Sequence, residues 1–297
     1  MLLELRKQYW ADLLLLLVVI IWGSTFPVMK LVLVDLSPFY YILLRFTLAF
    51  SVLGALYYKR LQGISTQALK KGLILGCWLF SGYAFQIIGL QYTTASRSGF
   101  ITGLAVIMVP FLAVVLLKEV LGFFNWLGVL LAVVGLFLLT GSGENGIYYG
   151  DYLTLLCALS FAVQIVLLSK YLAEHDPVML TVIQLAVVTV GSLLLTGLRG
   201  EFQPLNLQAV LVIVYTGLVA TAFSLLIQSY AQQYTSSTHT ALIFTLEPVF
   251  AALFAYLVLG EILERGGIIG GFLIIVGMLI AELMGKNKEK RGLKASG

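Results

Sequence analysis

A few charged residues stand inside long apolar stretches, where they could do chemistry. Glu247 lies in the middle of one such stretch and is followed by Pro248. A charge near the centre of an apolar helix costs about 2.5–3.5 kcal/mol on insertion scales and usually faces the protein interior. Because proline has no amide hydrogen, it leaves a backbone carbonyl one turn earlier without its helical donor. Glu247 could therefore bind a proton, a cation or a substrate amine. The alternative is that it hydrogen-bonds a neighbouring helix and fixes the packing.

Arg45 stands well inside another apolar stretch. Its planar guanidinium could hold a carboxylate through paired hydrogen bonds, which suits an amino acid or an organic anion. The alternatives are that it snorkels toward a membrane interface or pairs with another helix. Lys30 is nearer the end of its stretch, so we expect it to snorkel.

Glutamine, hydroxyl and aromatic residues recur in the same stretches and are candidates for lining a substrate cavity. Amides both donate and accept hydrogen bonds, and an aromatic ring could stack against an apolar or aromatic substrate. Interhelical hydrogen bonds, worth about 0.6 kcal/mol on average, and simple space filling are the competing explanations. The predicted substrate-binding residues are Trp22, Arg45, Tyr83, Gln86, Ser98, Thr102, Gln164, Gln184, Gln228 and Glu247, and the candidates for proton coupling are Glu247 and His239.

The composition indicates what holds these residues in place. Of the 297 residues 60% are hydrophobic and only 11% are charged, against roughly 25% charged residues in a soluble domain. A bilayer core about 30 Å thick needs roughly 20 helical residues to cross it, and only helices and closed barrels satisfy their backbone groups in lipid. The sequence therefore predicts an all-α integral membrane protein. Ten spans are expected near residues 12–34, 38–58, 71–91, 95–117, 125–141, 151–172, 178–197, 208–231, 237–259 and 265–285.

The basic residues predict how these spans are oriented. With a cytoplasmic N-terminus, 13 of the 18 Lys and Arg residues fall on the inner side, including those of the basic tail at 286–297. An excess of Lys and Arg on the cytoplasmic side is the usual topology signal. We expect a multi-pass protein of the cell inner (plasma) membrane with both termini in the cytoplasm. The basic residues left on the outer side are Lys30, Arg97, Arg199 and Arg265.

The two halves of the chain resemble each other. A shift of 139 residues carries Asp12 to Asp151, and a shift of 142 carries Gln86 to Gln228 and Glu119 to Glu261. Each half holds five expected spans, an odd number, so the second half must enter the bilayer with the opposite orientation. Inverted repeats of this kind are found in alternating-access transporters, whose substrate site lies near the midplane between the halves.

Several short segments are similar to a known family. Trp22-Gly23-Ser24-Thr25-Phe26, Leu90-Gln91-Tyr92-Thr93-Thr94-Ala95 and Leu246-Glu247-Pro248-Val249-Phe250 resemble the drug/metabolite transporter (DMT) superfamily, EamA-type branch. The resemblance covers nearly the whole chain. It implies ten helices as two five-helix repeats, at residues 1–142 and 143–285, and the export or exchange of small metabolites such as amino acids. It names no particular substrate.

We therefore expect a secondary transporter of small metabolites, most simply amino acids or related compounds, that works by alternating access. The chain has no GxxxxGK[ST] loop for ATP, and it lacks the clustered His, Cys and carboxylate residues of a membrane enzyme. A channel, or a carrier of nucleosides, organic cations or vitamins, is the alternative. No metal, cofactor or nucleic acid is expected. The expected partners are the substrate, the bilayer and a coupling proton, with the chain a monomer or a homodimer.

Overall fold

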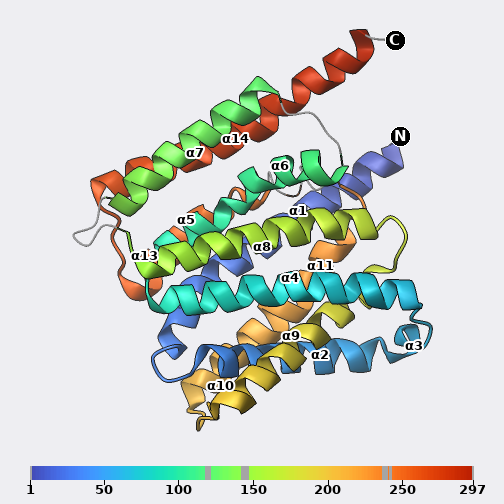
Figure 1. Ribbon diagram of the computed structural model, residues 1–297, viewed down its shortest axis with the longest axis vertical. Helices are drawn as coiled ribbons and strands as arrows, with labels where there is room; N and C mark the ends of the chain where they lie inside the picture. The colour runs from blue at the N-terminus through green and yellow to red at the C-terminus, as the bar shows by residue number, and fades with distance from the viewer. Residues whose placement is uncertain (1, 118–121, 142–146, 236–239, 241–242, 296–297) are drawn as a thin grey trace.

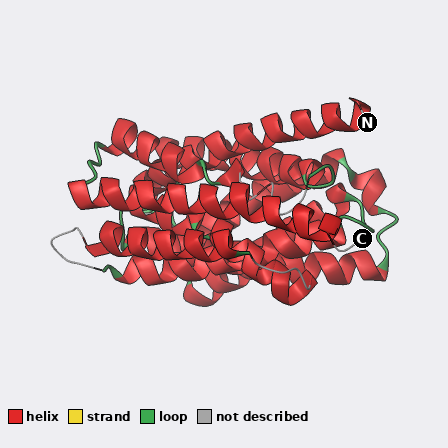
Figure 2. Cartoon of the chain, turned by 90° about the horizontal axis from the view of Figure 1, so that it is seen from above, coloured by secondary structure: helices red, strands yellow, loops and turns green. Residues whose placement is uncertain are grey.

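Every regular element in the described part of the chain is a helix. The computed structural model describes residues 2–117, 122–141, 147–235, 240 and 243–295. The helices lie side by side along one direction (Figure 2). This agrees with the predicted all-α class.

The described part of the first half contributes seven helical segments. They are α1 (Leu2–Val32), α2 (Pro38–Leu56), the short α3 (Tyr58–Leu61), α4 (Thr66–Gln91), α5 (Ala95–Gly103), α6 (Ala105–Leu117) and α7 (Phe123–Gly141).

The second half begins at α8 and includes a π-helical segment. Its elements are α8 (Tyr149–Tyr171), α9 (Pro177–Arg199), α10 (Leu207–Val214), the π-helix η1 (Tyr215–Phe223), α11 (Ser224–Ala231), α13 (Glu247–Leu259) and α14 (Arg265–Ala295). Leu207 to Ala231 forms one continuous stretch of 25 helical residues with the π-helix in its middle.

Seven stretches of the described residues are long and apolar enough to cross a membrane. They run over Tyr9–Val32, Pro38–Leu56, Thr66–Gln91, Ala95–Leu116, Tyr149–Tyr171, Pro177–Arg199 and Leu207–Ala231. Shorter apolar helices cover Trp126–Leu138, Glu247–Leu259 and Arg265–Ile280.

The helices begin where the sequence supplies caps. Ser37, Ser65, Thr94 and Asn206 each accept a hydrogen bond from a backbone N–H of the first turn that follows, which satisfies a donor that has no intrahelical partner. Pro38 and Pro177 stand at first helical positions, where the missing N–H costs nothing. Gly260 ends α13 at φ 68°, a left-handed conformation that glycine adopts without strain.

Both chain termini lie at one end of the bundle (Figure 1). We call the opposite end, where α1 finishes and α2, α5 and α8 begin, the Lys30 end. Apolar side chains fill most of the space between the helices. Two large clusters, one around Phe46 and Ile87 and the other around Phe100 and Ile165, make up most of this core.

The predicted fourth span runs without a gap over Ala95–Leu116 but contains one tightened turn. It divides into α5 and α6 at Leu104, whose N–H bonds to the carbonyls of Ile101 and Thr102. The repeat-related position in the second half is Leu246, where α13 begins. The sequence predicts one regular helix here, because no residue of this apolar stretch marks the turn at Leu104. Discontinuous helices are typical of transporter binding sites, because irregular backbone is tolerated where it lines a cavity.

Helices α7 and α14 form a closely packed pair at one edge of the bundle (Figure 1). A Cβ atom at Gly135 would lie 2.5 Å from the carbonyl oxygen of Gly270, and one at Gly277 would lie 2.6 Å from that of Gly128. Gly271 packs against the ring of Phe100 in the same way. The GxxxG spacings of α14 therefore serve contacts within this chain, where small residues let helix backbones approach.

Candidate functional site

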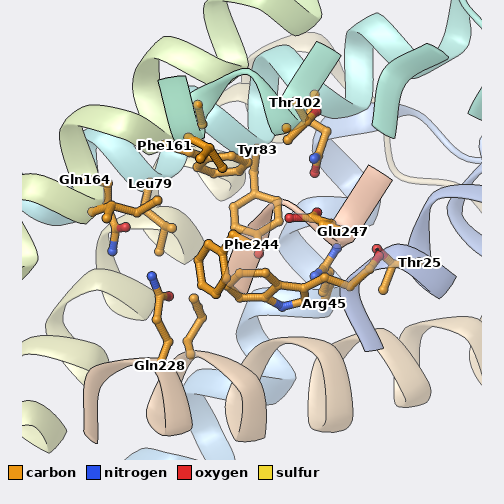
Figure 3. Close-up of a pocket in the computed structure, with 17 residues that line it drawn as sticks. Thr25, Arg45, Leu79, Tyr83, Thr102, Phe161, Gln164, Gln228, Phe244 and Glu247 are labelled. Atoms are coloured by element: carbon orange, nitrogen blue, oxygen red, sulfur yellow. Dashed lines mark hydrogen bonds between the residues drawn. The ribbon is translucent and has the colours of Figure 1, made fainter. Parts of the chain in front are cut away.

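The breaks in the helices border a buried cavity at the middle of the bundle (Figure 3). It has a volume of about 50 Å³, enough for a few water molecules. Its walls come from α1, α2 and α4–α6 of the first half and from α8, α11 and α13 of the second. Eight predicted residues line it: Trp22, Arg45, Tyr83, Gln86, Thr102, Gln164, Gln228 and Glu247.

Arg45 is held in the cavity wall by neutral partners. Its side chain comes from α2 and is 1% exposed. Its Nε donates to Thr221 Oγ1 at 2.6 Å, and its Nη1 lies 3.3 Å from Met29 Sδ. The guanidinium also lies over the ring of Tyr83, 4.8 Å from the centroid, which stabilises a cation through the ring quadrupole. Arg45 makes no ion pair with any described residue, so its positive charge is available to an anionic ligand.

The π-helix explains why Thr221 can hold this arginine. Thr221 Oγ1 donates to the carbonyl of Thr216, five residues earlier, at 2.8 Å. Its oxygen lone pairs are then free to accept from Arg45 Nε. A π-helix has more residues in each turn than an α-helix, and such segments are common at functional sites. Here the wider turn brings Thr221 to the buried guanidinium of Arg45. Sequence reasoning missed both Thr221 and Met29.

Glu247 faces the same cavity from the first turn of α13. It is 8% exposed and makes no hydrogen bond or ion pair with any described residue. The alternative role of a carboxyl that fixes packing by bonding a neighbouring helix therefore has no contact to support it. Figure 3 shows Glu247 on the same side of the pocket as Arg45 and Thr25. An acidic and a basic side chain thus line one cavity without pairing with each other.

Aromatic rings form the middle of the cavity wall. Tyr83 makes edge-to-face contacts with Phe161 and Phe46, with centroids 5.3 Å and 4.8 Å apart. Trp22 makes a similar contact with Phe244 at 5.3 Å and donates from Nε1 to the carbonyl of Ala220 at 2.9 Å. Sequence reasoning missed Phe161 and Phe244, because an apolar ring inside an apolar helix carries no signal of the face it presents.

Gln164 and Gln228 lie on the opposite side of the pocket from Glu247 (Figure 3). Both line it. Gln164 Nε2 donates to Gln184 Oε1 at 2.9 Å, and Gln184 Nε2 donates to the carbonyl of Leu180 at 3.1 Å. Gln184 therefore lies behind the wall and orients the amide that faces the cavity.

Some candidate residues lie elsewhere than predicted. Ser98 and Gln184 are buried but do not line the cavity. Lys30 does not line the cavity, as expected; its Nζ donates to the carbonyl of Thr93 at 2.5 Å and lies 3.9 Å from Glu261 Oε1. His239 lies outside the described residues.

Long apolar helices around a buried cavity that carries several polar side chains are typical of a multi-pass membrane transporter, and comparisons with known proteins agree. The EamA-like transporter family matches the chain twice, over residues 9–141 and 148–283. An uncharacterized transporter of Archaeoglobus fulgidus is 38% identical over 277 residues, which are 93% of this chain and 87% of that protein. The uncharacterized transporter YdfC of Bacillus subtilis is 25% identical over 89% of this chain and 88% of its own length.

One solved crystal structure shares the fold. It overlays with a TM-score of 0.69 at 18% identity and covers 94% of this chain and 98% of that one. Since the family matches nearly the whole sequence, the chain belongs to the EamA-like transporter family, and the resemblance to the DMT superfamily is confirmed.

Proposed function

We propose that the protein is a secondary carrier that binds small zwitterionic metabolites, amino acids above all, in the central cavity and moves them by alternating access. The observation that carries this proposal is the unpaired Arg45 and Glu247 in the wall of one buried cavity. Arg45 would take the substrate carboxylate through its planar fork. Glu247 would take the ammonium group, or a proton when the cavity is empty of substrate.

The desolvation of both charges favours this function over a purely structural one. A buried guanidinium without an ionic partner is unfavourable in a resting protein, and so is the ionised form of a buried carboxyl. A zwitterion supplies the missing charge to each of them at once, so binding recovers electrostatic energy that a neutral solute cannot. The aromatic wall accepts the apolar part of such a molecule.

The architecture that we propose is ten spans in two inverted five-helix repeats, at residues 1–142 and 143–285. The repeat-related sequence positions, the two consecutive family matches and the helix boundaries near Leu104 and Leu246 support it. The predicted topology puts 13 of the 18 Lys and Arg residues on the side of the termini, so we propose that the termini are cytoplasmic. The Lys30 end then faces outward.

Counterflow of labelled amino acids into proteoliposomes tests this function. Vesicles loaded with one unlabelled amino acid should accumulate the same labelled compound transiently and saturably, whereas vesicles without protein should not. Counterflow of nucleosides, organic cations or vitamins, with none for amino acids, would show that the substrate class is wrong. Flux that never saturates would favour a channel over a carrier.

A further inference from the structure

Charged residues at the Lys30 end join the two halves of the chain. Arg97 on α5 and Asp151 on α8 form an ion pair, with Nη2 and Oδ2 2.5 Å apart and side chains 7% and 4% exposed. Asp151 also accepts from Thr93 Oγ1 at 2.6 Å and from the backbone N–H of Tyr148 at 3.0 Å. A carboxylate with this set of donors is firmly held, because each bond is charge-assisted.

Glu261 makes a second connection of this kind. Its position just after α13 suggests a cap for the helix that follows it in the chain, but the structure gives it different partners. Instead it accepts from the backbone N–H groups of Ala95 and Ser96, each at 2.9 Å, and from Ser96 Oγ at 2.9 Å. Glu261 therefore caps α5, a helix of the other half, where a negative charge also complements the helix dipole. Lys30, which bonds the carbonyl of Thr93, lies 3.9 Å from the same carboxylate.

Close backbone packing lies between these ionic contacts and the cavity. A Cβ atom at Gly99 on α5 would overlap the Cβ atom of Ala251 on α13. One at Gly23 on α1 would lie 2.6 Å from Phe250 Cβ. No side chain larger than hydrogen fits at either position, so α1 and α5 seal directly against α13. On this side of the cavity the two halves are in full contact.

We infer that Lys30, Arg97, Asp151 and Glu261 form an ionic closure that holds the two halves together at the Lys30 end, and that it breaks and re-forms in each transport cycle. Thr102, which lines the cavity, and Arg97 share α5. The helix that Glu261 caps is therefore also part of the cavity wall. Opening at the Lys30 end must detach α5 or its neighbours from α8 and α13, and every ionic contact described above crosses that boundary. The four residues act as positioning residues for transport and do not themselves touch the substrate.

Sided cysteine labelling tests the closure. Cys77 and Cys157 are both free thiols, so the reporter is Ala105→Cys, in the cavity wall, in a chain in which both native cysteines are replaced by alanine. A membrane-impermeant maleimide is applied to proteoliposomes from each side in turn. In Arg97→Gln and Glu261→Gln we expect labelling from the Lys30 end to rise at least about tenfold and labelling from the terminal end to fall. Without ligand, a shift of the equilibrium toward the conformation open at the Lys30 end makes the reporter cysteine more accessible from that end and less accessible from the other.

Two control substitutions separate closure from general loosening. Lys59→Gln removes an exposed charge whose ring contact, with Tyr58 at 6.0 Å, stays within the first half, and it should leave both labelling rates unchanged. Gly99→Ala is a third closure variant: it introduces a methyl group at the contact between α5 and α13 without changing charge, and it should reproduce the effect of Arg97→Gln. Its control is Gly54→Ala, where a Cβ would meet no atom within 4 Å, and this variant should leave both labelling rates unchanged. Faster labelling from both sides, or no change from either side, would overturn the closure.

The proposed closure rests on the proposed carrier function, but different results would refute each of the two proposals. Opposite changes in labelling without counterflow of any tested compound by the unmodified protein would support the closure and contradict the proposed substrate class. Saturable counterflow with unchanged labelling in all three closure variants would support the carrier and refute the closure.

Discussion

Replacing Arg45 with lysine tests the proposed carboxylate site while keeping the charge. The guanidinium has enough donors to bond Thr221 through Nε and still present its terminal nitrogens to a ligand. A lysine ammonium is a point charge without this fork and cannot lie flat over the ring of Tyr83 as the guanidinium does at 4.8 Å. The variant should therefore lose at least one charge-assisted hydrogen bond to the substrate.

The expected size of the effect follows from that loss. A hydrogen bond to a charged group contributes about 1.5–3 kcal/mol, so the Kd for a substrate carboxylate should rise roughly 10- to 150-fold. The assay is substrate binding by titration calorimetry in detergent, with the amide analogue of the same substrate measured in parallel. The amide should bind weakly to both proteins, with little difference between them.

Arg199→Lys is the matched control, because Arg199 also stacks on an aromatic ring, that of Phe39 at 4.9 Å, but does not line the cavity. It should bind the substrate as the unmodified protein does. Equal affinity of the unmodified protein for the acid and its amide would refute the reasoning, and so would an equal loss of both in Arg45→Lys.

Three further predictions concern other parts of the structure. Glu247→Gln should abolish proton-driven flux while leaving some passive exchange; an unchanged pH dependence of transport would show that Glu247 carries no proton. Gln184→Leu removes the acceptor that orients Gln164 and should raise the KM roughly 2- to 10-fold without affecting folding, and an unchanged KM would mean that the amide orientation does not matter. Gly135→Ala should lower the free energy of unfolding by about 1–3 kcal/mol through overpacking against α14, as measured by thermal denaturation, whereas Gly54→Ala should be neutral; equal stability of the two variants would contradict the close packing of this pair.

The sequence predicted the long apolar helices and much of the cavity because both depend on strong local signals. The desolvation cost marks a charge such as Arg45 or Glu247 as inward-facing wherever it falls in an apolar stretch. The repeat pairs Gln86 with Gln228, and both line the cavity. Composition and spacing were enough for these features.

Other features depend on tertiary contacts that no local pattern reveals. Glu261 follows the end of α13, so its sequence position suggested a cap for the next helix, whereas the fold brings it to α5. The π-helix that turns Thr221 toward Arg45 and the break at Leu104 leave no distinct signature in an apolar sequence. Phe161 and Phe244 belong to the cavity only because of the way in which their helices are rotated.

Accelerated exchange is the most direct test of alternating access through one cavity. Efflux of a labelled amino acid from preloaded proteoliposomes is measured with and without the same unlabelled compound outside. If one cavity with Arg45 and Glu247 in its wall serves both sides in turn, external substrate should accelerate efflux saturably, and Arg45→Lys should shift the half-saturating concentration upward. Efflux that is indifferent to external substrate and linear in concentration would contradict the account.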